Sequence, residues 1–403
     1  MRFEEKRKKG GGIGFVLAVW AASRLLYLVC GQIFARAVPT SGFQRVTLDV
    51  PSGSMNLWSH WDGEHYVTLA LGGYLTPPDN VSPAFFPLYP LLVRSFAELF
   101  GGPISRETLS AWAPLLSILF LPLALYFVYR IALDGWGEGV ARGAVLALAL
   151  FPTTFFLNAA YTESLFLALS AGAVWAVRVR KNLLLACVLA GLASATRNVG
   201  VFLVLPLLYE WIQNLDHYRW RGAYLALVPS GLVAYMGYLW ARFGDPLLFY
   251  AAQEKWGREP TGPLATVGRA WTSAVEGAGR LLDPGLWTDP TLGNLANHLA
   301  AAGNLTNLAF FVFAVTVLLA GARDLPPSLT LYALLLVAPA TLFGTPQSPL
   351  MGTPRYVLVA FPLFIVLGLL SENNRWLFRG WLLLGTILSL MLCALFVTWH
   401  FVA

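Results

Sequence analysis

The run FFPLYPLLVRSFAELF, residues 85–100, decides how this chain is threaded, because it is almost apolar enough to span a membrane but too short to do so. At about 1.5 Å per residue, a helix of this length reaches about 24 Å, whereas the hydrocarbon core of a bilayer is about 30 Å thick. Pro87 and Pro90 also weaken a spanning helix, as do Arg94 and Glu98, four residues apart on one helical face. The run therefore predicts a helix that lies in the membrane interface.

The composition of the whole chain supports a membrane setting. Of 403 residues, 57% are hydrophobic and only 12% are charged, and the mean hydropathy is +0.63. Soluble domains carry about 25% charged residues. The sequence therefore predicts an all-α, polytopic membrane protein with about eleven transmembrane helices. The predicted spans are residues 13–37, 109–133, 140–158, 162–178, 182–196, 199–215, 222–243, 300–320, 327–345, 354–371 and 377–400.

The distribution of basic residues predicts the orientation of these spans. Cytoplasmic loops are enriched in Lys and Arg. If residues 85–100 do not span, all the basic clusters fall on the side of the N-terminus, which is then cytoplasmic; these clusters are Arg130 with Arg142, Arg178 with Arg180 and Lys181, Arg219 with Arg221, Arg323, and Arg375 with Arg379. If the run does span, every cluster moves outside. The same rule predicts that residues 182–196 and 199–215 form two short membrane passes and not one long helix.

Two long hydrophilic loops, residues 38–108 and 244–299, then face the outside and are expected to carry the active site. Both mix aromatic residues, prolines and charges and neither is of low complexity, so we expect them to fold onto the membrane face. With no internal repeat, residues 1–403 are predicted to form one membrane domain with external juxtamembrane helices. Because the basic residues are scattered at helix ends, we expect membrane lipids as partners and no nucleic acid.

The stretch WSHWDGEHY, residues 58–66, carries the strongest sign of chemistry in these loops. A loop that only linked two helices would not need two carboxylates and two histidines among aromatic side chains. Asp62 or Glu64 could take a proton from an acceptor hydroxyl, since a general base needs an acidic side chain close to a polar substrate. Gly63 is expected to let the backbone turn sharply behind them. The plain alternative is an ordinary polar loop.

A divalent metal ion is a second alternative at this stretch. His60, Asp62 and His65 are side chains of the types that bind such ions. Their spacing matches no strong metal-binding signature, so neither a metal nor another cofactor is predicted.

Glu163 opens the span 162–178 at its outer boundary, in the stretch NAAYTES. A carboxylate there complements the positive end of the helix dipole, which is the simpler interpretation. A role in the site is the other, because an ionisable group near a membrane is costly to keep.

Arg197 and Arg355 lie in short outside turns and so contradict the charge bias. A guanidinium group offers a fork of donors that fits a phosphate. The alternatives are pairing with Glu163 or Asp62, or extension toward the interface. Arg24, inside the first predicted span, presents the same choice.

These motifs, taken in order, resemble a known family. Ser23-Arg24, Trp61-Asp62-Gly63-Glu64-His65-Tyr66, Phe86-Pro87-Leu88-Tyr89-Pro90, Tyr161-Thr162-Glu163-Ser164 and Thr196-Arg197-Asn198 together resemble the PIG-V mannosyltransferases, the family of GPI mannosyltransferase 2 and its prokaryotic relatives. The resemblance runs from about residue 13 to 371 and is strongest before residue 210.

The resemblance implies a GT-C-like fold and an inverting, polyprenyl-phosphate-mannose-dependent mannosyltransferase. Such an enzyme moves mannose from a polyprenyl- or dolichyl-phosphate carrier to a lipid-, glycan- or protein-linked acceptor on the extracytoplasmic face of the cell or ER membrane. It implies that Asp62 is the catalytic carboxylate, with Glu64 and Glu163 as further catalytic candidates. The candidates for substrate binding are His65, Tyr66, Arg197, Asn198, Gln253, Trp256, Arg355 and Tyr356.

A transporter or flippase of lipid-linked sugars or polar solutes is the competing class. Transporters keep ionisable groups near the membrane midplane and often contain inverted repeats. The acidic candidates here lie in loops and at helix ends on one side, which favours the enzyme. The sequence leaves open the acceptor, the linkage, the exact donor sugar, the oligomeric state and the source compartment.

Overall fold

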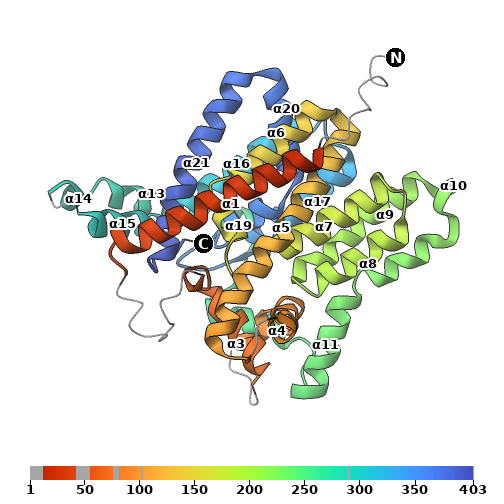
Figure 1. Cartoon of the computed structure of the whole chain (residues 1–403), viewed down its shortest axis with the longest axis horizontal. Coiled ribbons are helices and arrows are strands. Elements are labelled where there is room, and N and C mark those ends of the chain that lie inside the picture. Colours follow the sequence, from red (N-terminus) through yellow and green to blue (C-terminus); the bar gives the residue numbers. More distant parts are fainter. Residues whose placement is uncertain (1–11, 42–54, 76–80, 101–102, 289–290, 403) are drawn as a thin grey trace.

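The computed structural model describes residues 12–41, 55–75, 81–100, 103–288 and 291–402. The N-terminal basic residues and parts of the first external loop lie outside these ranges. Nearly all regular structure is helical (Figure 1). Its helices are α1 (Gly12–Ala37), α3 (Asp62–Gly72), α4 (Leu88–Phe100), α5 (Arg106–Trp136), α6 (Glu138–Ala149), α7 (Glu163–Arg178), α8 (Leu183–Ser194), α9 (Val204–Gln213), α10 (Leu215–Tyr218), α11 (Ser230–Phe243), α12 (Leu248–Ala251), α13 (Pro263–Leu281), α14 (Pro284–Thr288), α15 (Leu292–Ala301), α16 (Gly303–Gly321), α17 (Pro327–Val337), α18 (Pro339–Leu342), α19 (Thr353–Val359), α20 (Pro362–Asn373) and α21 (Arg375–Val397).

Short 3-10 helices and one pair of two-residue strands complete the fold. The 3-10 helices are η2 (Asn56–Trp58), η3 (Ser82–Ala84), η4 (Thr154–Leu157), η5 (Asn198–Leu203), η6 (Arg219–Leu227) and η7 (Ala252–Trp256). The strands β1 (Glu259–Pro260) and β2 (Phe343–Gly344) pair antiparallel. This pairing joins the second long hydrophilic loop to the segment that leads into α19.

Some helices begin at a residue whose side chain caps the first turn. The side chain of Ser105 accepts a hydrogen bond from the backbone of Thr108 at 3.1 Å, and that of Asn182 accepts one from Leu185 at 2.9 Å. Asn374 caps α21 in the same way, at 3.0 Å from the backbone nitrogen of Leu377. Such caps satisfy amide groups that the first turn of a helix leaves unpaired.

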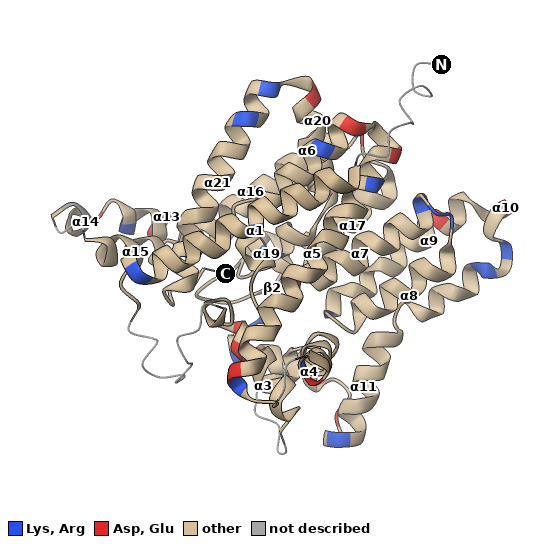
Figure 2. Ribbon diagram, in the orientation of Figure 1, with Lys and Arg blue, Asp and Glu red and all other residues tan. Residues whose placement is uncertain are grey.

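The apolar helices make this chain an integral, multi-pass membrane protein. Five described helical stretches are long and apolar enough to span: Gly12–Ala37, Arg106–Trp136, Leu215–Phe243, Gly303–Gly321 and Arg375–Val397. Charged residues colour mainly the helix ends, and the middle parts of α5, α7, α8 and α21 carry none (Figure 2). Shorter apolar helices lie at 183–194, 198–213 and 327–342. The total of eleven spans and their orientation stay predictions.

Two predicted spans take a different form in the structure. The span 354–371 is broken into α19 and α20, which meet at 68°. The span 140–158 is helical only to Ala149, and irregular backbone with η4 follows. Both breaks lie beside the candidate site, where irregular backbone can place side chains that a straight helix could not.

Residues 88–100 form a separate short helix, α4, as the sequence predicted. The helix packs against α3 and α5 in one apolar cluster, where Tyr89 and Val93 are fully buried. Its outer side keeps Leu91, Leu99 and Phe100 exposed, at 59%, 75% and 67%. An amphipathic helix with this pattern suits a membrane interface.

Candidate active site

One cavity of about 160 Å³ lies between the segment around α3, the hydrophilic loop that contains η7 and β1, and the start of α19. It gathers residues from parts of the chain that are far apart in the sequence. Its lining is Asp62, Tyr66, Ala84, Phe85, Phe86, Thr196, Arg197, Asn198, Gln253, Trp256, Arg258, Met351, Gly352, Arg355, Tyr356 and Phe401.

Asp62 is the first residue of α3 and is held at one end of this cavity. Its backbone N–H donates to the hydroxyl of Tyr161 at 3.2 Å. The preceding residue, Trp61, has φ 58° in a region that L-residues seldom adopt. The sharp turn is therefore at Trp61, whereas the sequence analysis expected it at Gly63. Gly63 packs closely, because a Cβ there would come within 3.3 Å of the Ala160 side chain.

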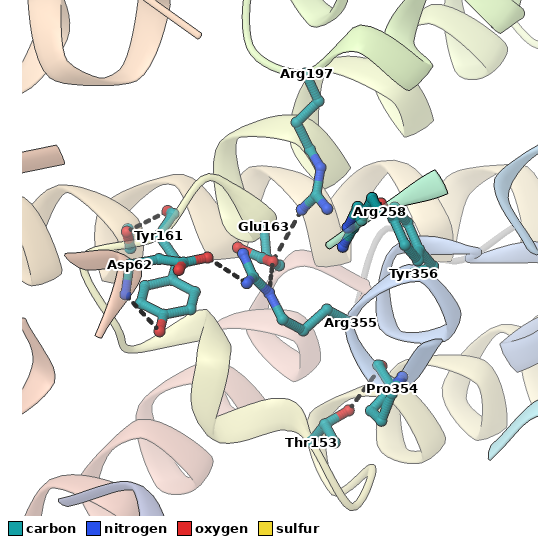
Figure 3. Close-up of polar contacts among 10 residues, drawn as sticks. Asp62, Thr153, Tyr161, Glu163, Arg197, Arg258, Pro354, Arg355 and Tyr356 are labelled. Atoms are coloured by element: carbon teal, nitrogen blue, oxygen red, sulfur yellow. Dashed lines mark hydrogen bonds and ion pairs between the residues drawn. The ribbon is translucent and has the colours of Figure 1, made fainter. Parts of the chain in front are cut away.

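Glu163 lies between two arginines at the centre of the site (Figure 3). Its Oε1 accepts from Arg355 Nε at 2.6 Å and from Arg197 Nη1 at 2.8 Å. Arg355 also donates through Nη1 to Asp62 Oδ2. The Glu163 side chain is fully buried and each arginine side chain is 13% exposed. The structure thus shows the pairing that the sequence had left as one of the alternatives for both arginines.

Stacked aromatic rings hold the two guanidinium groups in place. Arg355 lies 4.5 Å from the ring centre of Tyr161, and Arg197 lies 5.5 Å from that of Tyr356. Each guanidinium is thus fixed by both charge and ring contact. Two carboxylates and two guanidinium groups form one connected network with no net charge.

Arg258 supplies a third guanidinium group at the other end of the cavity. It directly precedes β1, and its Nη1 lies 3.4 Å from the hydroxyl of Tyr356. Figure 3 shows Arg258 and Tyr356 on the far side of Arg355 from Asp62. Among the residues that the structure describes, no carboxylate pairs with Arg258. The cavity therefore carries a carboxylate at one end and a positive charge without an anionic partner at the other.

Most of the predicted site residues meet at this cavity. Eight of them line it: Asp62, Tyr66, Arg197, Asn198, Gln253, Trp256, Arg355 and Tyr356. Glu163 lies directly behind the lining. Glu64 and His65 do not line it, since they point to other sides of α3. The ring of His65 stacks on Phe85 with centres 4.6 Å apart.

Glu64 instead occupies an apolar setting beside α5. Its Oε1 is buried and accepts no hydrogen bond within the described part of the chain. Burial raises the pKa of the Glu64 carboxyl to about 7, although nearby Arg106 opposes the shift.

The histidines do not gather with Asp62. His60 stacks on Trp399 with ring centres 4.0 Å apart, and its Nδ1 lies 3.4 Å from the Phe396 carbonyl. In the ranges that the structure describes, no three His, Cys, Asp or Glu side chains are placed to hold one metal ion.

Arg24 has no contact with the cavity and clamps the irregular backbone after α6. Its guanidinium donates to Asn158 Oδ1 at 2.6 Å, to the carbonyls of Thr154 and Ala149 at 3.1 and 3.3 Å, and to Thr154 Oγ1 at 3.2 Å. The same backbone is held on its other side, where Thr153 Oγ1 donates to the Pro354 carbonyl at 3.2 Å. Arg24 therefore supports the backbone that carries Tyr161 and Glu163 and does not itself reach the cavity.

Sequence reasoning missed Arg258 and Phe401. Arg258 lies in the second long hydrophilic loop, where a basic residue is ordinary and gives no signal of a site. The pairing of β1 with β2 brings it to the cavity. Phe401 follows the last span and looks like part of an apolar run. A partial signal existed for Arg258, because it is two residues from the predicted Trp256.

Comparison with known proteins agrees with these motifs. Residues 40–205 match the family model described as Mannosyltransferase (PIG-V). The human GPI alpha-1,6-mannosyltransferase 2 is 32% identical over 219 residues, which cover 49% of this chain and 43% of that protein. GPI mannosyltransferase 2 of Schizosaccharomyces pombe is 25% identical over 224 residues, covering 49% of this chain and 47% of that protein. The chain thus spans about half the length of these relatives, or less.

A solved structure extends the likeness of fold to nearly the whole chain. ArnT from Cupriavidus metallidurans, bound to undecaprenyl phosphate, superposes with a TM-score of 0.52 at 14% identity, covering 94% of this chain and 63% of ArnT. The fold is thus the predicted GT-C-like one. The sequence match over residues 40–205 contains Asp62, Glu163 and Arg197, and it confirms the resemblance of this chain to the PIG-V mannosyltransferase family.

Proposed function

We propose that this protein is an inverting mannosyltransferase that takes mannose from a polyprenyl- or dolichyl-phosphate carrier on the extracytoplasmic face of the membrane. The acceptor is a lipid-, glycan- or protein-linked hydroxyl group. One observation carries the proposal: the lining of one cavity includes a carboxylate, Asp62, and an arginine, Arg258, that pairs with no carboxylate among the described residues, and the two lie on opposite sides of Arg355 (Figure 3).

This arrangement suits an in-line displacement at the anomeric carbon. The acceptor oxygen attacks from one face, its proton passes to Asp62, and the bond between the anomeric carbon and the phosphate oxygen breaks on the other face. The electron pair of that bond leaves with the carrier phosphate, which gains negative charge and needs no protonating acid. A fixed cation at that end stabilises the developing charge.

Asp62 keeps one oxygen available for this role. Arg355 binds Oδ2, whereas Oδ1 accepts no hydrogen bond from the described residues, and the side chain is 32% exposed. Arg355 and Glu163 thus orient the base, and Arg197 completes the network that holds them. We assign Gln253 and Trp256, on the cavity wall near Arg258, to contacts with the donor sugar.

The relatives support this function through their names. Both proteins compared above are GPI mannosyltransferases, and the ArnT structure holds a polyprenyl phosphate. A lipid-phosphate donor and a glycolipid acceptor for this chain follow by analogy with them. The enzyme is favoured over the transporter because the charged network lies in one cavity, beside the two long hydrophilic loops.

The decisive experiment incubates the purified protein with polyprenyl-phosphate mannose and follows release of the carrier phosphate and transfer of the sugar. Asp62→Asn keeps the side-chain shape and removes the base, so turnover should fall by about 10²–10⁴-fold. A variant with near-full turnover would show that Asp62 is not the base. Wild-type protein that moves the intact donor between vesicle leaflets without consuming it would favour the flippase.

A further inference from the structure

The chain returns to the cavity after α21, and several contacts hold it there. The backbone N–H of Ser41 donates to the Thr398 carbonyl at 3.0 Å, and its hydroxyl donates to the Trp399 carbonyl. The backbone N–H of His400 donates to Leu395 at 2.9 Å, and its Nε2 lies 3.2 Å from Asn297 Oδ1 in α15. Residues 398–401 are therefore tied to three separate parts of the fold.

Aromatic contacts join this segment to the residues around Asp62. The ring of Phe401 meets Trp61 edge-on, with centres 5.4 Å apart and planes at 78°. Trp399 lies 5.7 Å from Trp61 and stacks on His60. Contacts of this geometry stabilise by about 0.5–1.5 kcal/mol each beyond the area they bury.

Two residues of this aromatic cluster have strained backbone conformations. Trp61 has φ 58° and Trp399 has φ 64°, and these two residues contact each other. Such conformations cost about 1–3 kcal/mol each and persist only where the surroundings enforce them. The packing thus fixes an aromatic wall, Trp61 with Trp399 and Phe401, immediately beside Asp62.

Phe401 turns part of this wall toward the cavity. Its side chain is 45% exposed, yet it lines the same cavity as Asp62 and the arginines. A large apolar ring in a cavity lined by charged groups implies a ligand with both apolar and polar surfaces. A pyranose is such a ligand, since its C–H bonds form a flat apolar face and its hydroxyl groups project from the edge.

We propose that Phe401, braced by Trp61, forms the acceptor subsite, on which a sugar ring of the acceptor stacks. This inference rests on the proposed function. The ring lies with its C–H face on Phe401 and directs one hydroxyl to Asp62. The donor phosphate occupies the opposite end, so the acceptor approaches the anomeric carbon from the side that inversion requires.

The test measures acceptor and donor dependence separately in the purified protein. Polyprenyl-phosphate mannose serves as donor, and a set of short-chain alkyl glycosides is compared with an acylated peptide that contains Ser and Thr. Phe401→Ala should raise the KM for the preferred alkyl glycoside about 5- to 10-fold, with the larger part of the change in the acceptor KM and less than twofold in the donor KM. Phe401→Tyr, which keeps the ring, should restore most of the affinity. Trp376→Ala is the matched control, because Trp376 is 79% exposed at the other end of α21.

Several outcomes would overturn the subsite. An acceptor KM that is unchanged in Phe401→Ala, or transfer to the peptide in place of every glycoside, would do so. An equal rise in both KM values with a lower melting temperature would show that the ring only supports the fold. Equilibrium binding of the alkyl glycoside to wild type and Phe401→Ala tests the subsite without turnover. A wild-type protein that consumes no donor would count against the proposed function. A wild type that consumes donor normally, with the same acceptor KM as Phe401→Ala, would count against the subsite alone.

Discussion

Glu163→Gln removes one negative charge from between two arginines. Its effect distinguishes a charge at a helix end from a carboxylate that holds the site together. The Glu163 side chain is fully buried, and its Oε1 accepts from Arg355 and Arg197 at 2.6 and 2.8 Å. A carboxylate that only complements a helix N-terminus contributes about 0.3–1 kcal/mol. A buried carboxylate that balances two guanidinium groups contributes more.

The magnitude follows from these contacts. Glutamine keeps an acceptor oxygen, so both hydrogen bonds can form again as weaker ones. The carboxylate bonds join two ionised groups, whereas the glutamine bonds keep only the charged donor, so the two bonds together lose about 2 kcal/mol. Breaking a buried ion pair outright costs about 3–5 kcal/mol. We therefore expect the free energy of unfolding to fall by about 2–5 kcal/mol, with a loss of turnover because Arg355 also holds Asp62.

The assay is denaturant unfolding of the purified protein in detergent, together with steady-state turnover. Glu138→Gln is the matched control, since Glu138 opens α6 as Glu163 opens α7 but is 43% exposed and pairs with Arg142. The control should lose no more than about 1 kcal/mol. If Glu163→Gln costs no more than its control and leaves turnover intact, Glu163 is a helix-end charge and the ion-pair argument is wrong.

Three further predictions follow from the structure. Arg258→Gln should raise the donor KM more than Arg258→Lys does, because Lys keeps the charge but loses the guanidinium fork; equal donor KM values in both variants and wild type would exclude a phosphate role. Burial raises the pKa of Glu64 from 4.5 to about 7, so the folded protein binds more protons than the unfolded chain between these pH values. The free energy of unfolding should therefore fall as the pH rises from about 4.5 to 7. Glu64→Gln should flatten this dependence when unfolding is measured at several pH values, and an unchanged slope would contradict it. In a background without native cysteines, a cysteine at Thr288 should react with an impermeant reagent from outside intact cells and one at Asn373 should not; external labelling at Asn373 would reverse the predicted orientation.

The sequence predicts the helical framework well because its signals are local. Apolar run length identifies α1, α5, α16 and α21. The short run with Pro87 and Pro90 identifies α4 as a separate helix, and the basic-residue rule separates α8 from the apolar helix that follows it. Each of these conclusions needs only residues close together in the chain.

Breaks and contacts that depend on distant residues could not be predicted in this way. The end of α6 at Ala149 is stabilised by Arg24, which lies 125 residues earlier. The bend between α19 and α20 falls at Pro362, within one apolar run, and its angle depends on the packing around it. Asp62 was found because two carboxylates and two histidines stand together among aromatic residues there, whereas Arg258 and Phe401 reach the cavity only through tertiary contacts.

Arg24 also bears on how the protein is made. It lies midway along α1, and an arginine at the centre of a spanning helix costs about 3 kcal/mol during insertion. Its partners, the Ala149 and Thr154 carbonyls and the Asn158 side chain, are synthesised more than a hundred residues later, and among the described residues it has no carboxylate partner. The first helix is apolar enough to insert by itself, but its guanidinium group gains these partners only after the backbone that supports Tyr161 and Glu163 has been made. Folding of the first helix and assembly of the site are therefore linked through one side chain.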